Sequence, residues 1–491
     1  MVPYEVTKPT GGFLVRRELV MVCFVTAVMA SATVRAQYVP PPTTSAPSPP
    51  VSTRLPPAPF LGSVPKGTAT AEPITLTVLD AINRALDNNL GVLLSDDAKG
   101  RAAGARWRAL GALLPDVVGR ATATRQLIDL AAYGFPLPEG IPAVVGPFNL
   151  FDVRAYGSMP IYDLRALNDL RAERHNVAAA DHTYKSAREL VVLVAANGYL
   201  QALAASARAD SARAQRDTAQ ALFDQATDLR ANGLAAGIEV LRAQVELDQE
   251  RQRVTASQND FEKAKLQLAR IVGLPLGQPF TLVSELPDVP VPDLTLESAL
   301  EQAYRLRPDY LAALERVKAA EAARAAAVGD MSPSAHLNAD YGELVASTSS
   351  HITFAIVGAI NVPIFQGGKR GKLMEADADL RSRRSEADDL KAAIYYDVKT
   401  TFMDLQANGE QLQVATRARD VAQTALTQSR DRFAAGVTNN LEVVQAQEAV
   451  SRANEQYINA LYLYNVDKAL LARNLGDAEQ AVRRYLGGPR Q

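Results

Sequence analysis

A two-residue alternation of apolar and polar side chains marks the segment 350–365. Its apolar face carries Ile352, Phe354 and Ile356, and Thr353 and Asn361 fall on the opposite face. This period is typical of a strand with two unlike faces, because successive side chains of a strand point to opposite sides. The same kind of pattern recurs elsewhere and predicts two β-hairpins. Their strands are expected at about 116–131, 147–162, 334–347 and 350–365.

Each predicted hairpin leads into a very long stretch with a helical period. Ile394, Val398, Phe402 and Leu405 recur at steps of four and three, which indicates one apolar seam along a helix. At 1.5 Å per residue, such a helix would reach roughly 100 Å, a length that bridges two distant places. Together with shorter neighbours, the helices are expected at about 74–113, 164–230, 237–272, 294–328, 367–433 and 440–475.

The order of these elements occurs twice. Pro160 and Gly233 each have a counterpart 203 residues later, at Pro363 and Gly436. Each proline stands where a strand is expected to close and hand the chain to a long helix. Each glycine follows the end of such a helix, where the positive φ of a C-cap is needed. The chain is therefore interpreted as a duplication of helix, β-hairpin, long helix and returning helix.

The duplication sets the expected organisation of the 491 residues. A basic and then apolar start, with Val34-Arg35-Ala36 as a cleavage site, predicts a signal peptide over 1–36. The only cysteine, Cys23, lies inside it and would be removed, which leaves no thiol in the mature chain. The expected parts are the signal peptide at 1–36, a Pro-rich disordered leader at 37–73, the first repeat at 74–274, a linker at 275–293, the second repeat at 294–476 and a C-terminal tail at 477–491.

Composition and motifs exclude several classes of function. The formal net charge is −2, which gives no reason to expect a nucleic-acid partner. Neither a nucleophile elbow nor a dinucleotide fingerprint is found, so we expect no enzyme and no cofactor. His175 and His182 are seven residues apart, unlike the usual four of helical metal ligands, and they are interpreted as part of a solvated helix face. Beyond the predicted signal peptide no apolar run suits a transmembrane helix, so any membrane contact is expected through strands.

The doubled order of elements resembles the TolC-like outer-membrane efflux channel family. The resemblance covers about residues 74–475, and its most specific parts are the two proline junctions and the turn Arg432-Phe433-Ala434-Ala435-Gly436-Val437. It implies a mostly α protein with a membrane β-barrel. In that family a homotrimer forms one 12-stranded barrel in the bacterial outer membrane, continued by an α-helical tunnel through the periplasm. The implied partners are outer-membrane lipid, a periplasmic adaptor and an inner-membrane pump of the RND, ABC or MFS type.

The resemblance also implies roles for residues at the helix tips. An acidic ring at the periplasmic entrance would use Glu239 and Glu442, while Gln445 stands at a further acidic position of the family. Phe433 matches an aromatic residue of the gate, but Thr438 stands where some relatives have an arginine. Adaptor docking would use the turn residues Arg230, Gly233, Leu234, Arg432, Gly436 and Val437.

The resulting hypothesis is a passive exit duct for solutes that a partner pump delivers. We expect Glu442 to make the entrance favour cations. One alternative is a periplasmic coiled-coil scaffold without a pore, and another is the periplasmic adaptor itself. The adaptor would have a single helical hairpin between small β-domains, whereas this sequence has two equal hairpins. The sequence leaves open what is exported and which class of pump is served.

Overall fold

The structure is a computed structural model that describes residues 58–134, 138, 140, 142–233, 236–283, 294–346, 349–435, 437–438 and 440–486. All the described residues belong to one compact unit, Pro56–Gln491. The predicted signal peptide and the first part of the predicted leader lie outside the described residues.

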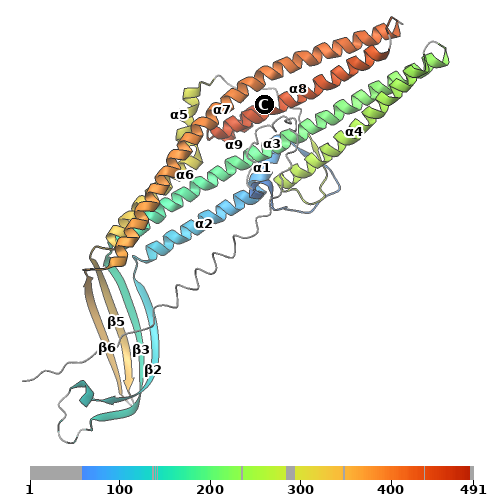
Figure 1. The fold of residues 1–491 in the computed structure, drawn as a ribbon. Helices are drawn as coiled ribbons and strands as arrows, with labels where there is room; N and C mark the ends of the chain where they lie inside the picture. Colours follow the sequence, from blue (N-terminus) through green and yellow to red (C-terminus); the bar gives the residue numbers. More distant parts are fainter. Residues whose placement is uncertain are drawn as a thin grey trace, which may run out of the picture. The chain divides into compact units, whose positions relative to one another are not determined.

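Four antiparallel strands form one sheet in the order β2-β3-β5-β6 (Figure 1). The strands are β2 (Asp116–Asp129), β3 (Val144–Tyr162), β5 (Ser334–Ala346) and β6 (Ser349–Asn361). The two predicted hairpins join through β3 and β5, so each repeat contributes two neighbouring strands. The last strand ends at Asn361 and not near 365, and the segment 362–366 that follows has no regular structure.

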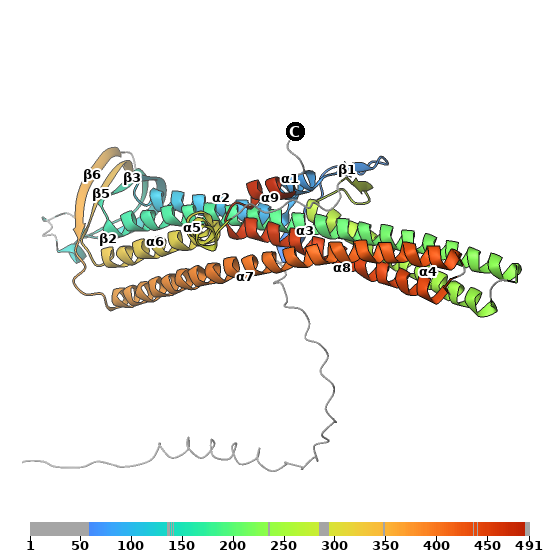
Figure 2. The same ribbon diagram turned by 90° about the horizontal axis from the view of Figure 1, so that it is seen from above.

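Four helices continue from the sheet in one layer, in which each packs on the next (Figures 1 and 2). Their order is α2 (Leu90–Gly111), α3 (Leu164–Ala231), α6 (Pro308–Gly329) and α7 (Gly367–Ala434). Farther from the sheet, α3 turns back into α4 (Gly237–Val272) and α7 into α8 (Asn440–Asn474). The α3/α4 hairpin and the α7/α8 hairpin contact each other mainly through α3 and α8.

The first helix of each repeat is broken, contrary to the prediction of single helices over 74–113 and 294–328. In the first repeat, α1 (Val78–Asn88) ends at Asn89, whose backbone is extended and whose side chain accepts from the Gly91 amide as the N-cap of α2. In the second repeat, α5 (Leu296–Leu306) ends before Pro308, the first residue of α6. In the second repeat the cause is local, because a residue before proline disfavours helical backbone and proline suits the first helical position.

The main core gathers short segments that lie in the predicted leader, linker and tail and at the start of the first predicted helix. Strand β1 (Ile74–Leu76) pairs in parallel with β4 (Phe280–Leu282), which lies in the predicted linker. A 3₁₀ helix, η1 (Ala58–Leu61), lies in the predicted leader, and α9 (Ala478–Leu486) lies in the predicted tail. These segments pack with α1, α3 and α4 around one apolar cluster that includes Tyr199 and Leu268. The expectation of a disordered leader up to 73 was therefore wrong in this part, and the predicted C-terminal tail contains a helix.

Among the described helices, α3 holds a stretch that is long and apolar enough to cross a membrane. Within that stretch, 67% of the residues are buried against the rest of the protein. Val191, Ala195 and Tyr199, at steps of four along this helix, are all at most 1% exposed. The apolar character of α3 thus serves the core of the helical bundle.

Candidate functional site: the helix tips and the strand junctions

At the tip of the α7/α8 hairpin, Glu442 makes polar contacts with two residues of the same hairpin. Nη1 of Arg432, on the last turn of α7, lies 3.2 Å from Glu442 Oε1. The hydroxyl of Thr438 donates to Glu442 Oε2. Thr438, which replaces the arginine of some family members, therefore still holds the acidic residue. Since Arg432 neutralises part of the charge of Glu442, the expected preference for cations would be weaker than an unpaired carboxylate would give.

Phe433 joins the tip to an apolar cluster between the hairpins. This cluster contains Leu222 of α3, Leu426 of α7 and Val443 of α8, and Phe433 packs against it. The gate aromatic that the family resemblance implied thus has a packing role that links both repeats. Gln445 is exposed on α8, one turn beyond Glu442.

At the α3/α4 tip the acidic residue pairs within its own helix α4 and not across the hairpin. Arg242 Nη1 lies 3.3 Å from Glu239 Oε1, while Glu239 Oε2 is buried without a hydrogen-bond partner. Gly233 has a φ of +76°, the left-handed backbone that its predicted role as a C-cap requires. Arg230 lies over Gly237, the first residue of α4, with 3.6 Å between its guanidinium carbon and the place that a Cβ would take there.

Two of the predicted docking residues, Leu234 and Gly436, lie outside the described residues. Val437 is 68% exposed, and its amide donates to the Arg432 carbonyl at 2.9 Å. The described part of each turn is thus surface. Docking of a partner at these turns belongs to the proposed function.

The strand junctions differ between the repeats. Pro160 lies inside β3, where the pairing to β5 shifts register between Pro160 and Tyr162, so it does not close the strand as predicted. The shift has a simple cause, because proline has no N–H to give to the ladder. Asp163 then caps α3 by accepting from the Ala166 amide at 2.9 Å. Pro363, in contrast, follows the end of β6 and precedes α7.

One face of the sheet carries a polar network that sequence patterns did not reveal. Arg154 of β3 donates to Asp340 of β5 and, at 2.7 Å, to Thr353 of β6. It crosses β5 over Gly342, where an added Cβ would lie 2.7 Å from Arg154 Cβ. The network links strands of both repeats across 186 residues of sequence, which explains why only the fold reveals it.

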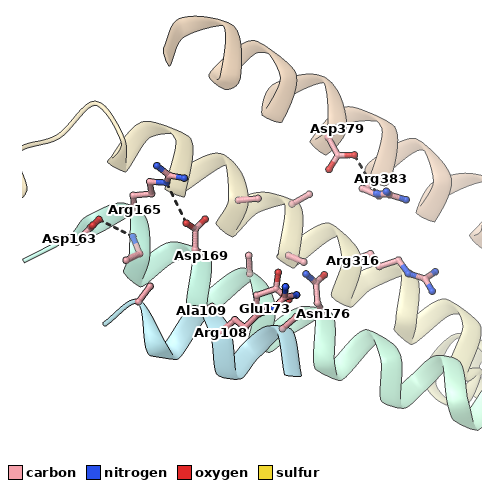
Figure 3. A pocket seen from close by; sticks show the side chains of 17 residues that line it. Arg108, Ala109, Asp163, Arg165, Asp169, Glu173, Asn176, Arg316, Asp379 and Arg383 are labelled. Carbon is pink, nitrogen blue, oxygen red and sulfur yellow. Dashed lines mark hydrogen bonds and ion pairs between the residues drawn. The ribbon is translucent and has the colours of Figure 1, made fainter. Parts of the chain in front are cut away.

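A hollow of about 810 Å³ is lined by residues of the four helices α2, α3, α6 and α7 (Figure 3). Alanines line the hollow together with equal numbers of cationic and anionic side chains. The charged residues are Arg108, Arg165, Arg316, Arg383, Asp163, Asp169, Glu173 and Asp379. The ion pairs Arg165–Asp169 and Arg383–Asp379, each at 3.6 Å, neutralise part of these charges.

A buried ionic cluster at the break between α5 and α6 was also missed. Arg307 donates to Asp309 at 2.6 Å and lies 3.3 Å from Asp397 of α7. Nearby on α3, burial raises the pKa of Glu189 to about 8, against the opposing influence of Arg473. The Arg-Pro-Asp sequence at 307–309 was the available signal, but the helix that faces it could not be named from sequence.

The two histidines of α3 are half-buried and do not lie on a solvated helix face as predicted, and His182 Nδ1 is buried without a hydrogen-bond partner. His175 Nδ1 lies 2.7 Å from Glu315 Oε2, in a pair between α3 and α6. Across the described ranges, no group of three or more His, Cys, Asp or Glu side chains could hold a metal ion. These regions thus offer ion pairs, apolar contacts and a hollow lined by charged side chains.

The sheet contains strands of both repeats, and each repeat also has a long helical hairpin. This architecture can be compared with known protein families. The model of the outer membrane efflux protein family matches residues 81–274 and 299–477, which are the two repeats. This chain belongs to that family. The match omits the predicted linker, and it covers the two repeats as two separate segments.

Curated relatives are efflux and export proteins of the outer membrane. The outer membrane protein TolC of Escherichia coli (strain K12) is 22% identical over 335 residues, which are 64% of this chain and 67% of the relative. The toluene efflux pump outer membrane protein TtgF of Pseudomonas putida is 27% identical over 371 residues, 71% of this chain and 72% of the relative.

Solved structures share the fold. The outer-membrane channel OprN aligns with a TM-score of 0.69 at 21% identity, over 82% of this chain and 90% of that one. The CmeC outer membrane channel of Campylobacter jejuni aligns with a TM-score of 0.72 at 16% identity, over 89% and 94%. The predicted resemblance to TolC-like channels is thereby confirmed. The protein is an outer-membrane efflux channel of this family that extends into the periplasm, and family members are channels and not enzymes.

Proposed function

We propose that this chain forms a passive homotrimeric duct in the outer membrane. Two edge strands, β2 and β6, have no further partner within the described sheet. Unpaired strand edges are costly in lipid, because no water is present to satisfy their backbone groups. Three copies placed edge to edge would close a barrel of 12 strands, the number that the family implies.

The two faces of the sheet support this proposal. Phe354 and Ile356 on one face are 73% and 70% exposed, as side chains against lipid would be in an isolated chain. The other face carries Arg154, Asp340 and Thr353, which suit a water-filled interior. In the closed assembly the helical layer, with its charged hollow, would continue the passage.

The helix tips would form the periplasmic entrance and dock a periplasmic adaptor and its inner-membrane pump. The described part of each turn is exposed, and each tip has a glutamate paired with an arginine, Glu239 with Arg242 and Glu442 with Arg432. The equivalence of the two tips favours docking over two unrelated turns. Opening would move one hairpin against the other and would be driven by partner binding.

The first experiment is the subunit count of protein extracted from fractionated membranes, measured by light scattering after size exclusion. We expect a trimer that only detergent releases from the outer membrane and that gives discrete conductance steps in a planar bilayer. A soluble periplasmic monomer or dimer without conductance would overturn the proposal. The matched control is a chain without β2–β3, which is expected to lose membrane retention.

A further inference from the structure

A row of polar contacts joins the two hairpins along α3 and α8. Helix–helix seams of this length usually pack apolar side chains, so a polar row is informative. Two of its members are buried, since Gln447 is 1% and Gln215 7% exposed. The contacts are Tyr462 Oη to Asn197 Oδ1 at 2.8 Å, Arg208 Nε to Glu455 Oε2 at 3.0 Å, Asn454 Nδ2 to Ser211 Oγ at 3.3 Å and Gln447 Nε2 to the Gln215 carbonyl at 3.1 Å.

The end of this row nearest the tips is organised around Arg253 of α4. Its Nη1 donates to Glu250 Oε1 at 2.7 Å, to Gln215 Oε1 of α3 at 3.0 Å and to Ser451 Oγ of α8 at 2.6 Å. One guanidinium thus connects three helices and both hairpins. Charged hydrogen bonds of this kind are stronger than neutral ones, and the carboxylate end of the Arg253–Glu250 pair is buried although Arg253 itself is 47% exposed.

Glu250 is the unusual member of this cluster. Its side chain is 2% exposed, and its Oε2 is buried without a hydrogen-bond partner, as is Oε1 of Gln447. Burial raises the pKa of Glu250, and Arg253 opposes the rise. An ionised carboxylate is held here with one oxygen unsatisfied, which is unfavourable. The protonated form has no such cost and offers a donor to this cluster of acceptors.

We propose that Glu250 and Arg253 form a proton-sensitive latch that holds the two hairpins together just above the tips. The inference rests on the proposed channel and names a control on its entrance. Separation of the hairpins would hydrate Glu250 and return its pKa toward the ordinary value. Because the latched state favours the protonated form, acid pH stabilises it, and rising pH favours separation.

Apart from Arg253, the groups around Glu250 do not oppose the stabilisation of the latched state by acid pH. On α4, burial and then the charges of Glu250 and Glu448 raise the pKa of Glu246, so that carboxylate is also easier to keep neutral. Glu448 comes from α8, and Arg253 is the cation of the cluster. The contact from α3 is the uncharged Gln215. Acidification therefore removes repulsion between α4 and α8 while Arg253 keeps its bonds to Gln215 and Ser451.

The test is the open probability of the full-length channel in planar bilayers between pH 5 and pH 8. For the wild type we expect a rise with pH of up to about tenfold for each unit by which the pKa of Glu250 differs between the two states. Glu250→Gln, which is nearly isosteric and cannot ionise, should reduce the dependence to less than about twofold and keep the channel mostly closed. Glu262→Gln, at an exposed position of the same helix, is the control and should behave as the wild type. An unchanged pH profile in Glu250→Gln would overturn the proposal.

A second variant keeps the test decisive if Glu250→Gln misfolds. In Ser211→Cys/Asn454→Cys, an oxidised disulfide would join α3 and α8 where their side chains already meet. It should remove the response to pH, and a reducing agent should restore it. A full pH response in the oxidised protein would contradict the latch. The absence of any conductance at any pH in both the wild type and the reduced variant would instead contradict the proposed channel, so the two failures are distinguishable.

Discussion

Arg432 and Glu442 form an ion pair across the second tip, with Nη1 of the arginine 3.2 Å from Oε1 of the carboxylate. Both side chains are partly exposed, so the pair contributes only about 0.2–1 kcal/mol to stability. Its larger effect is on the local field, because the arginine offsets the charge that a ring of Glu442 side chains would present to passing ions.

Removal of this arginine is therefore expected to increase selectivity for cations. Arg432→Gln should shift the reversal potential of the proposed channel toward that of a cation pore, and Glu442→Gln should shift it in the opposite direction. The measurement is the reversal potential in a tenfold KCl gradient, with Arg430→Gln on the same helix as control. Equal potentials for all these variants would show that the tip does not select ions.

Gly342 is expected to tolerate no side chain. An added Cβ would meet Arg154 Cβ and the Val153 carbonyl oxygen, each at 2.7 Å, so either the strand or the arginine must move. Gly342→Ala should lower the thermal midpoint of the folded protein, at a cost of about 1–3 kcal/mol. Gly358→Ala on the neighbouring strand is the matched control, because nothing lies within 4 Å of its Cβ. Equal midpoints for the two variants would contradict the tight crossing.

Asp467 is expected to make stability fall as pH rises. Burial raises its pKa to about 6, against the hydrogen bond from Asn408 and with the help of Asp404. Since the folded state binds the proton more tightly, this stability is fully present below the ordinary pKa of about 3.9 and is lost as pH rises through about 6. Asp467→Asn should therefore stabilise the protein by about 1–3 kcal/mol at pH 7.5 and have no effect at pH 4.

Denaturant titrations at the two pH values measure this difference. The exposed Asp388→Asn on α7 serves as control and should show no such dependence. If Asp467→Asn gains the same stability at both pH values, packing and not ionisation is the cause of its difference in stability from the wild type.

Asn89 is expected to matter more than an ordinary helix cap. Its side chain accepts from the Gly91 amide at 2.8 Å and donates to the Phe60 carbonyl at 2.8 Å, and the residue is fully buried. Asn89→Ala removes both bonds and leaves buried groups unpaired, with an expected loss of about 2–4 kcal/mol. Thr295→Ala removes an exposed cap only and should cost about 0.5–1 kcal/mol in the same unfolding measurement.

Local patterns in the sequence were sufficient for the elements and their repetition. The alternation around Phe354, the seam at Ile394 and Val398 and the glycine at Gly233 report on neighbouring residues, and helices and strands are set largely by such neighbours. The same patterns carried the family resemblance that the comparisons confirmed. They were less able to locate the breaks in the first helices, although Pro308 carried a signal for one of them.

The tertiary structure decided every contact between the repeats. The sequence by itself determined two copies of one order of elements, because periodicity is a property of adjacent residues. It did not determine that Arg154 crosses Gly342, that α8 meets α3 through polar groups, or that Glu250 is buried beside Arg253. These contacts join residues that are far apart in the chain, and their side chains are ordinary until the fold removes water from them.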